Sequence, residues 1–90
     1  MQNIDKADTA VGTTLAAIIM QMKELEGVAF REDMAIVTEL GFASIEVVTL
    51  IERIKSEFGV AFGEDPDDLN ALRQFGSLVR WIEERQRLPQ

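Results

Sequence analysis

The chain contains neither cysteine nor histidine, and these two absences exclude several kinds of chemistry. Without cysteine there is no thiol nucleophile, no disulfide and no thiolate ligand for zinc, and without histidine there is no imidazole base. No metal site is expected, and any thiol chemistry must come from a group that the chain borrows. Because nothing indicates an oxidising compartment, the expected location is the cytoplasm.

Long apolar segments are missing as well. The longest uninterrupted apolar run, Leu15 to Met20, is far too short to cross a bilayer, so membrane insertion is not expected. Residues Met1 to Lys6 show no basic stretch followed by a long apolar one, so the sequence has no sign of a secretory leader.

Basic residues are scarce: nine Lys and Arg stand against sixteen Asp and Glu, which gives a net charge of −7. Such a charge repels phosphate backbones and attracts partners with Lys and Arg patches, so nucleic-acid binding is not expected. The acidity is concentrated in residues 32–68, where ten acidic residues are accompanied by Arg53 and Lys55 only, a local net charge of −8.

The size and composition are those of one small globular domain. Of the 90 residues, 47% are hydrophobic and 28% are charged. We therefore expect a single domain over 1–90, monomeric, with flexible ends at 1–7 and 88–90.

The first amphipathic pattern predicts a helix beginning near residue 9. Apolar residues recur at steps of three and four from Val11 to Leu25. Asp8 or Thr9 can cap the start of this helix, and Gly27 is placed to end it.

The second amphipathic pattern predicts a helix from Ser44 to Phe58 that stops at Gly59. Its expected core-facing residues lie three or four positions apart, with two further apolar residues beside them. They are Ile45, Val48, Ile51, Ile54 and Phe58, with Val47 and Leu50 broadening the stripe.

Two shorter signals complete the expected fold. Pro66 fits the first turn of a short helix reaching Leu72, and Ser77 is a suitable N-cap for a last helix ending near Arg87. Between the two main patterns, residues 28–43 read as a long loop with apolar anchors at Phe30, Met34, Ile36, Val37 and Leu40. The expected fold is all-α: a four-helix bundle with three main helices, a short third helix and a long loop between the first two.

Ser44 follows Gly41 at the point where the chain enters the second helix. The first N–H groups of a helix are unpaired, so a phosphate on the Ser44 hydroxyl would be stabilised by them and by the helix dipole. The simpler interpretation is that Ser44 only caps the helix.

The segment from Ile36 to Val60 resembles the acyl and peptidyl carrier proteins without a gap. This family shows Leu-Gly-x-Asp-Ser-Leu followed by an acidic amphipathic helix ending Glu-Phe-Gly-Ile. The matching residues are Leu40, Gly41, Ser44, Ile45, Val48, Leu50, Ile54, Glu57, Phe58, Gly59 and Val60. Phe75 to Ile82 is similar to the family's Thr-Val-Gly-Asp-Ala-Val-Asp-Tyr-Ile ending, so the resemblance covers most of the chain.

The resemblance implies that Ser44 carries a covalent 4′-phosphopantetheine arm, whose thiol holds acyl groups as thioesters. The residues around the attachment point would then be Gly41, Phe42, Ala43 and Ile45. A phosphopantetheinyl transferase would add the arm. The chain itself would be no enzyme, and would deliver its cargo to acyl-transferring or ketosynthase-type enzymes with basic patches, in a lipid, fatty-acid or polyketide-type pathway.

The surface around Ser44 departs from the family pattern. Ala43 stands where the family has Asp, which removes a carboxylate and an N-cap oxygen. Positions on the second helix that are usually acidic hold Thr49, Lys55 and Ser56. The expected partner-binding residues are Glu39, Glu46, Val47, Glu52 and Glu57, and Phe42 is a further candidate for apolar contact.

Two other functions remain open on the residues alone. Ala43 favours an unmodified, carrier-like helical adaptor that binds partner proteins. A small acidic enzyme would need a carboxylate pair such as Glu39 with Glu46. Trp81 is expected to pack against the first helix with its indole N–H near the surface. Five apolar side chains either fill the core or shelter an acyl chain: Leu15, Ile19, Ile51, Ile54 and Phe62.

Overall fold

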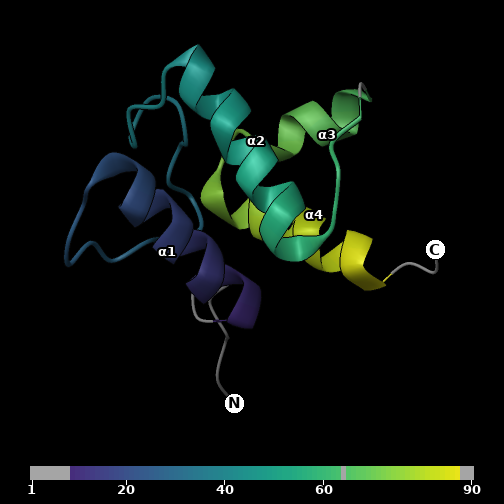
Figure 1. The fold of residues 1–90 in the computed structure, drawn as a ribbon, viewed down its shortest axis with the longest axis horizontal. Coiled ribbons are helices and arrows are strands. Elements are labelled where there is room, and N and C mark those ends of the chain that lie inside the picture. The colour runs from purple at the N-terminus through teal and green to yellow at the C-terminus, as the bar shows by residue number, and fades with distance from the viewer. Residues whose placement is uncertain (1–8, 64, 88–90) are drawn as a thin grey trace.

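Four helices make up the computed structural model, which describes residues 9–63 and 65–87. They are α1 (Ala10–Lys23), α2 (Ser44–Phe58), α3 (Pro66–Ala71) and α4 (Phe75–Arg87). α4 contacts both α1 and α3, and α1 also contacts α2 (Figure 1). The predicted all-α bundle with a short third helix and a long loop between α1 and α2 is therefore confirmed. The expected flexible ends lie outside the described residues.

None of the helices within these two ranges has the length and apolar character needed to cross a membrane.

The core lies where the three longer helices meet the long loop. Most of the predicted loop anchors are buried, but Val37 is 53% exposed and is no anchor. The chain turns after Ala35, where the N–H groups of Glu39 and Leu40 donate to the Ala35 carbonyl. In this turn the side chain of Ile36 points into the core, and that of Val37, the next residue, points outward. The fully buried side chains of the core are Leu15, Ile19, Ile36, Leu50, Ile54, Phe75, Leu78, Val79 and Ile82.

The buried face of α2 differs from the predicted one in its first turns. Ile45 and Val48, expected in the core, are 71% and 53% exposed. The core-facing residues are instead those that the sequence placed beside the stripe, Val47 and Leu50, followed by the predicted Ile54 and Phe58. Both sets have helical spacing, so packing against the rest of the bundle decides between them.

α1 ends earlier than predicted. The helix stops at Glu24, three residues before Gly27: Glu24 has a left-handed backbone (φ 55°), and the N–H groups of Glu24 and Leu25 both donate to the carbonyl of Met20. The bond from Leu25 is the 6→1 bond of a Schellman motif and the bond from Glu24 is the 5→1 bond of the αL motif, and both satisfy the Met20 carbonyl. As a result, Lys23 is the last residue of α1. At the other end, the structure selects Thr9 from the two predicted caps, since Thr9 Oγ1 accepts from the Gly12 N–H at 3.1 Å.

α4 begins at Phe75, so the prediction of Ser77 as its N-cap is wrong. The N–H groups of Phe75 and Gly76 donate to the loop carbonyls of Met34 and Glu32, at 2.9 and 2.8 Å. Carbonyl groups of the long loop thus accept hydrogen bonds from the first N–H groups of α4, which would otherwise need a capping side chain. The hydroxyl of Ser77 instead donates to the carbonyls of residues 71 and 74, both at 2.9 Å.

Candidate functional site

Ser44 is the first residue of α2, and it is exposed. The N-cap position belongs to Ala43, whose backbone is extended (φ −78°, ψ 164°) and whose methyl group cannot accept a hydrogen bond. The interpretation of Ser44 as the N-cap is therefore wrong. Among the described residues its hydroxyl makes no hydrogen bond, so it neither caps α2 nor pairs with another described side chain.

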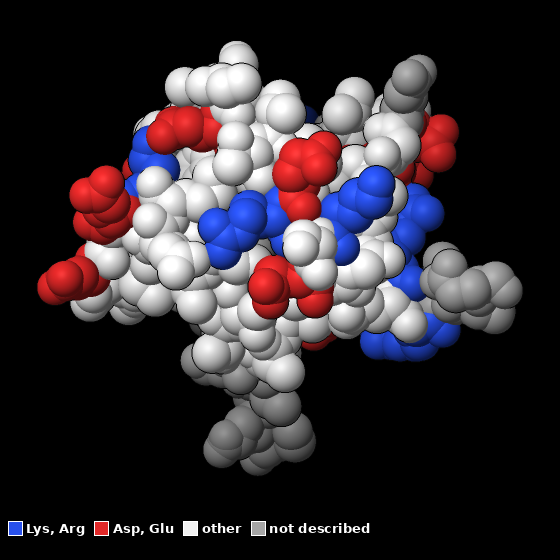
Figure 2. Space-filling view, in the orientation of Figure 1, with Lys and Arg blue, Asp and Glu red and all other residues white. Residues whose placement is uncertain are grey.

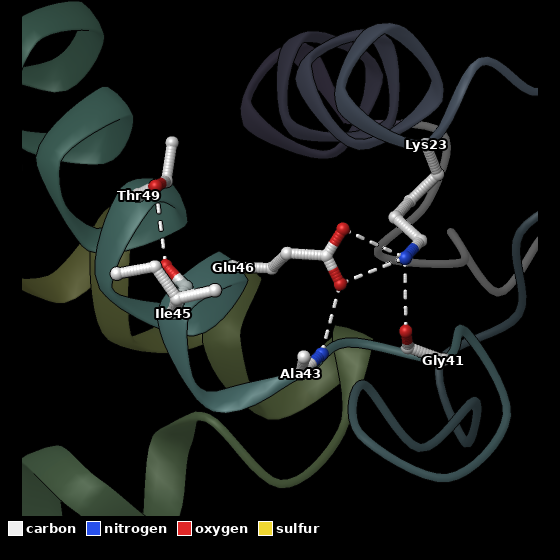
Figure 3. A network of polar contacts seen from close by, with 6 residues as sticks. All are labelled: Lys23, Gly41, Ala43, Ile45, Glu46 and Thr49. Atoms are coloured by element: carbon white, nitrogen blue, oxygen red, sulfur yellow. Dashed lines mark hydrogen bonds and ion pairs between the residues drawn. The ribbon is translucent and has the colours of Figure 1, made fainter.

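Glu46 organises the first turn of α2. Its Oε1 accepts a hydrogen bond from the Ala43 N–H at 2.9 Å, which is one half of a capping box. Its two oxygens also accept from Lys23 Nζ, at 2.8 and 3.0 Å (Figure 3). The bond from Ala43, and after it the bond from Lys23, hold the pKa of the Glu46 carboxyl below its usual range. Glu46 is therefore ionised at neutral pH, and its carboxylate is held in place by these three hydrogen bonds.

The turn before Ser44 is tied to the end of α1. Lys23 Nζ donates to the carbonyl of Gly41 at 2.9 Å and lies 5.4 Å from the centre of the Phe42 ring. Gly41 has a left-handed backbone (φ 71°), which glycine adopts without strain. Phe42 is only 3% exposed, so the prediction that its ring contacts a partner is wrong. The core and Lys23 cover the ring instead.

Exposed apolar side chains lie beside Ser44 on the outer side of α2. They are Ile45 and Val48, whereas Val47 is half-buried against the core. Thr49 Oγ1 donates to the Ile45 carbonyl at 3.1 Å, a local bond that leaves the Ile45 side chain free. The apolar surface next to Ser44 is thus formed by two residues that the sequence assigned to the core.

The acidic residues predicted to bind partners differ in their surroundings. Glu39 is bonded within the loop, to Arg31 Nη2 at 3.1 Å and to the Ala35 N–H at 2.9 Å, while Glu52 and Glu57 are exposed on α2. On the face shown in Figure 2, Lys and Arg side chains lie among the acidic ones. This face therefore carries no continuous acidic patch.

The two carboxylates considered for acid-base catalysis are engaged separately. Glu39 is bonded to Arg31, and Glu46 is bonded to Lys23. An acid-base pair needs one protonated and one ionised group aimed at the same substrate. The structure therefore gives the enzyme interpretation no support at these residues.

Most of the side chains considered for a cargo shelter pack within the core. Leu15, Ile19 and Ile54 are completely buried, and Phe62 stacks on Trp81 with ring centres 4.0 Å apart. A cleft of about 440 Å³ lies elsewhere, between the long loop and the connection from α3 to α4, and is lined by Ala35, Asn70, Arg73, Gln74 and Ser77. None of the five predicted shelter residues lines that cleft.

A second polar cluster, missed by the sequence analysis, surrounds Asp68. This carboxylate is 2% exposed and accepts from Trp81 Nε1 at 2.9 Å, Arg85 Nη2 at 2.7 Å and the Gly63 N–H at 2.8 Å. The prediction that the Trp81 indole N–H lies near the surface is wrong, because Asp68 binds it in the interior. A buried indole N–H needs a hydrogen-bond acceptor, so Trp81 in an apolar stretch was the signal in the sequence from which a buried partner could be inferred.

Comparison of the chain with protein-family models and with curated proteins finds no match.

Proposed function

We propose that the chain is a carrier protein that bears acyl groups as thioesters on a 4′-phosphopantetheine arm attached to Ser44 Oγ. The observation that carries the proposal is the exposed Ser44 hydroxyl, which sits at the start of α2 without serving as its cap. The unpaired N–H groups and the dipole at this helix end favour a phosphate there. Because the chain has no cysteine, the arm would supply its only thiol.

Attachment of the arm would use Ser44 as the acceptor in a transfer from coenzyme A. The Ser44 oxygen attacks the phosphorus next to the pantetheine group, a new O–P bond forms, and the O–P bond to the nucleotide breaks. Adenosine bisphosphate leaves, and the hydroxyl proton passes to a base of the transferase, because no described side chain is bonded to Ser44. This chain supplies the acceptor and the loop that presents it.

The test is to incubate the protein with coenzyme A and a broad-specificity phosphopantetheinyl transferase and to measure its intact mass. We expect the mass to increase by one phosphopantetheine group, and we expect Ser44→Ala to abolish the increase. Ser56→Ala, which removes another exposed hydroxyl from α2, is the matched control and is expected to be modified normally. An unmodified wild-type protein, or a modified Ser44→Ala variant, would contradict the proposal.

We also propose that partner enzymes, beginning with the transferase, contact the exposed apolar start of α2. Val48→Ser is expected to raise the transferase KM for the protein about fivefold, because a desolvated apolar contact in an interface is lost. Val37→Ser is the matched control, since Val37 and Val48 are both valines and both 53% exposed. Equal effects of the two substitutions would show that the contact is not specific to α2.

Basic groups of a partner would pair with Glu52 and Glu57, which are exposed on α2. Glu39 and Glu46 already form ion pairs within the chain. Docking is therefore expected to depend less on salt than it would for a continuous acidic face.

An unmodified adaptor is the second candidate function. Ala43 in place of the family's Asp favours it, and so do the exposed side chains of Ile45 and Val48, which suit direct protein contact. The intact-mass experiment separates the two functions, since an adaptor would gain no phosphopantetheine.

A further inference from the structure

Lys23 connects three parts of the molecule that are distant in sequence. Its ammonium group donates to both oxygens of Glu46 in α2 and to the carbonyl of Gly41 in the loop, at 2.8 to 3.0 Å (Figure 3). An ammonium group has three donors, so this arrangement uses all of them. The Lys23 side chain is 20% exposed and also lies over the Phe42 ring. The last residue of α1 therefore holds both sides of the turn that leads into Ser44.

This turn has few other attachments. Gly41 and Ala43 are exposed, and a side chain added at Gly41 would meet nothing within 4 Å. Ala43 has no side-chain oxygen to cap α2, so the bond from its N–H to Glu46 is what closes the first turn from outside the helix. Lys23 fixes the Glu46 carboxylate that makes this bond. Besides the buried Phe42 ring and the bond from the Val47 N–H to the Ala43 carbonyl, residues 41–43 are held by the bonds of Lys23 and Glu46.

We propose that Lys23 is a positioning residue for the modification of Ser44. It holds the turn at residues 41–43 and the first turn of α2 in the arrangement that presents the Ser44 hydroxyl to the transferase. This inference rests on the proposed function, because it concerns the same hydroxyl. In this chain the link between Lys23 and Glu46 supports the one half of the capping box that Ala43 can form, the bond from its N–H to the Glu46 carboxylate.

A positioning role and a merely structural role of Lys23 lead to different expected results. Partly exposed ion pairs contribute little to folding, so loss of Lys23 is expected to leave the fold intact. A positioning role predicts that the reaction at Ser44 slows in a protein that remains folded, since small displacements of a reacting group have large effects on rate.

The experiment compares Lys23→Met with wild type in transferase assays at saturating coenzyme A. We expect kcat for modification of the protein to fall about tenfold, with the KM for coenzyme A and the urea midpoint nearly unchanged. Lys23→Arg keeps the charge and the donors, and is expected to restore most of the rate. Lys55→Met, which removes the same charge from an exposed position on α2, is the matched control and is expected to react like wild type.

A second measurement follows the turn without any modification. Amide exchange by NMR is expected to be faster at residues 41–44 in Lys23→Met than in wild type, and unchanged in Lys55→Met. If wild type is modified while Lys23→Met reacts at the same rate, the positioning role is overturned and the proposed function stands. If exchange at residues 41–44 is the same in all variants, the positioning role is overturned whether or not Ser44 is modified. If wild type is not modified at all, the proposed function fails and takes this inference with it.

Discussion

Replacing Asp68 with alanine is expected to lower the free energy of unfolding by about 3 kcal/mol. Asp68 is the buried acceptor for Trp81 Nε1, Arg85 Nη2 and the Gly63 N–H. Its removal leaves the buried indole N–H without a partner and disconnects the segment before α3 from α4. Urea unfolding followed by far-ultraviolet circular dichroism measures the loss without depending on Trp81 fluorescence.

Asp67→Ala is the matched control for this prediction, because Asp67 is the exposed neighbour of Asp68 on α3. It is expected to change the free energy of unfolding by no more than about 0.5 kcal/mol. Similar losses in the two variants would mean that acidity near the start of α3, and not the buried cluster, accounts for the stability.

The pH dependence of this loss has a definite sign. The hydrogen bond from Trp81 is the main cause that lowers the pKa of Asp68 from its ordinary value of 3.8; Gly63 and Arg85 add to it, while burial opposes it. A carboxyl with a lowered folded-state pKa stabilises the fold above its unfolded value and loses that contribution as the pH falls through the folded value. The difference between wild type and Asp68→Ala is therefore expected to be constant near neutral pH and to shrink below about pH 4.

Gly76→Ala is expected to destabilise the protein by about 2 kcal/mol, although glycine to alanine usually stabilises a helix. Gly76 lies in the first turn of α4, directly against the long loop. An added Cβ would lie 2.7 Å from the Cβ of Glu32 and 3.0 Å from its carbonyl oxygen. The loop would have to move, and the bond from the Gly76 N–H to Glu32 would be strained or lost. Equilibrium unfolding in urea tests this.

Gly27→Ala provides the comparison. Gly27 has a positive φ of 67° but open space where a Cβ would lie, so its substitution costs backbone strain alone, about 1 kcal/mol. If Gly76→Ala were neutral or stabilising, the close packing of the loop on α4 would be contradicted.

The candidate site was predicted in part from local pattern. The exposed Ser44 at the start of a helix follows from the glycine before it and the amphipathic run after it, both of which are local. The contacts of Lys23 with Gly41 and Glu46 were not predicted, because they join residues on different helices and a loop. Spacing along the chain carries no information about such pairs.

The proposed partner surface illustrates the same limit. Ile45 with Val48 and Val47 with Leu50 are equally good helical stripes in the sequence. Burial of the second pair leaves the first exposed beside Ser44. A prediction of which apolar residues meet a partner therefore depends on how α2 packs against the rest of the bundle.

Local sequence by itself determined the number and order of the helices, the extent of α2, the stop at Gly59 and the proline start of α3. These features depend on helical periodicity, on proline's fixed φ and on the left-handed conformation of glycine, all of which act within a few residues. Only the tertiary structure decided where α4 begins, which face of α2 is buried, and how Lys23 and Asp68 are paired. Those outcomes depend on free energy gained between segments far apart in the chain, where loop carbonyls, buried donors and competing apolar faces find their partners only after the chain has folded.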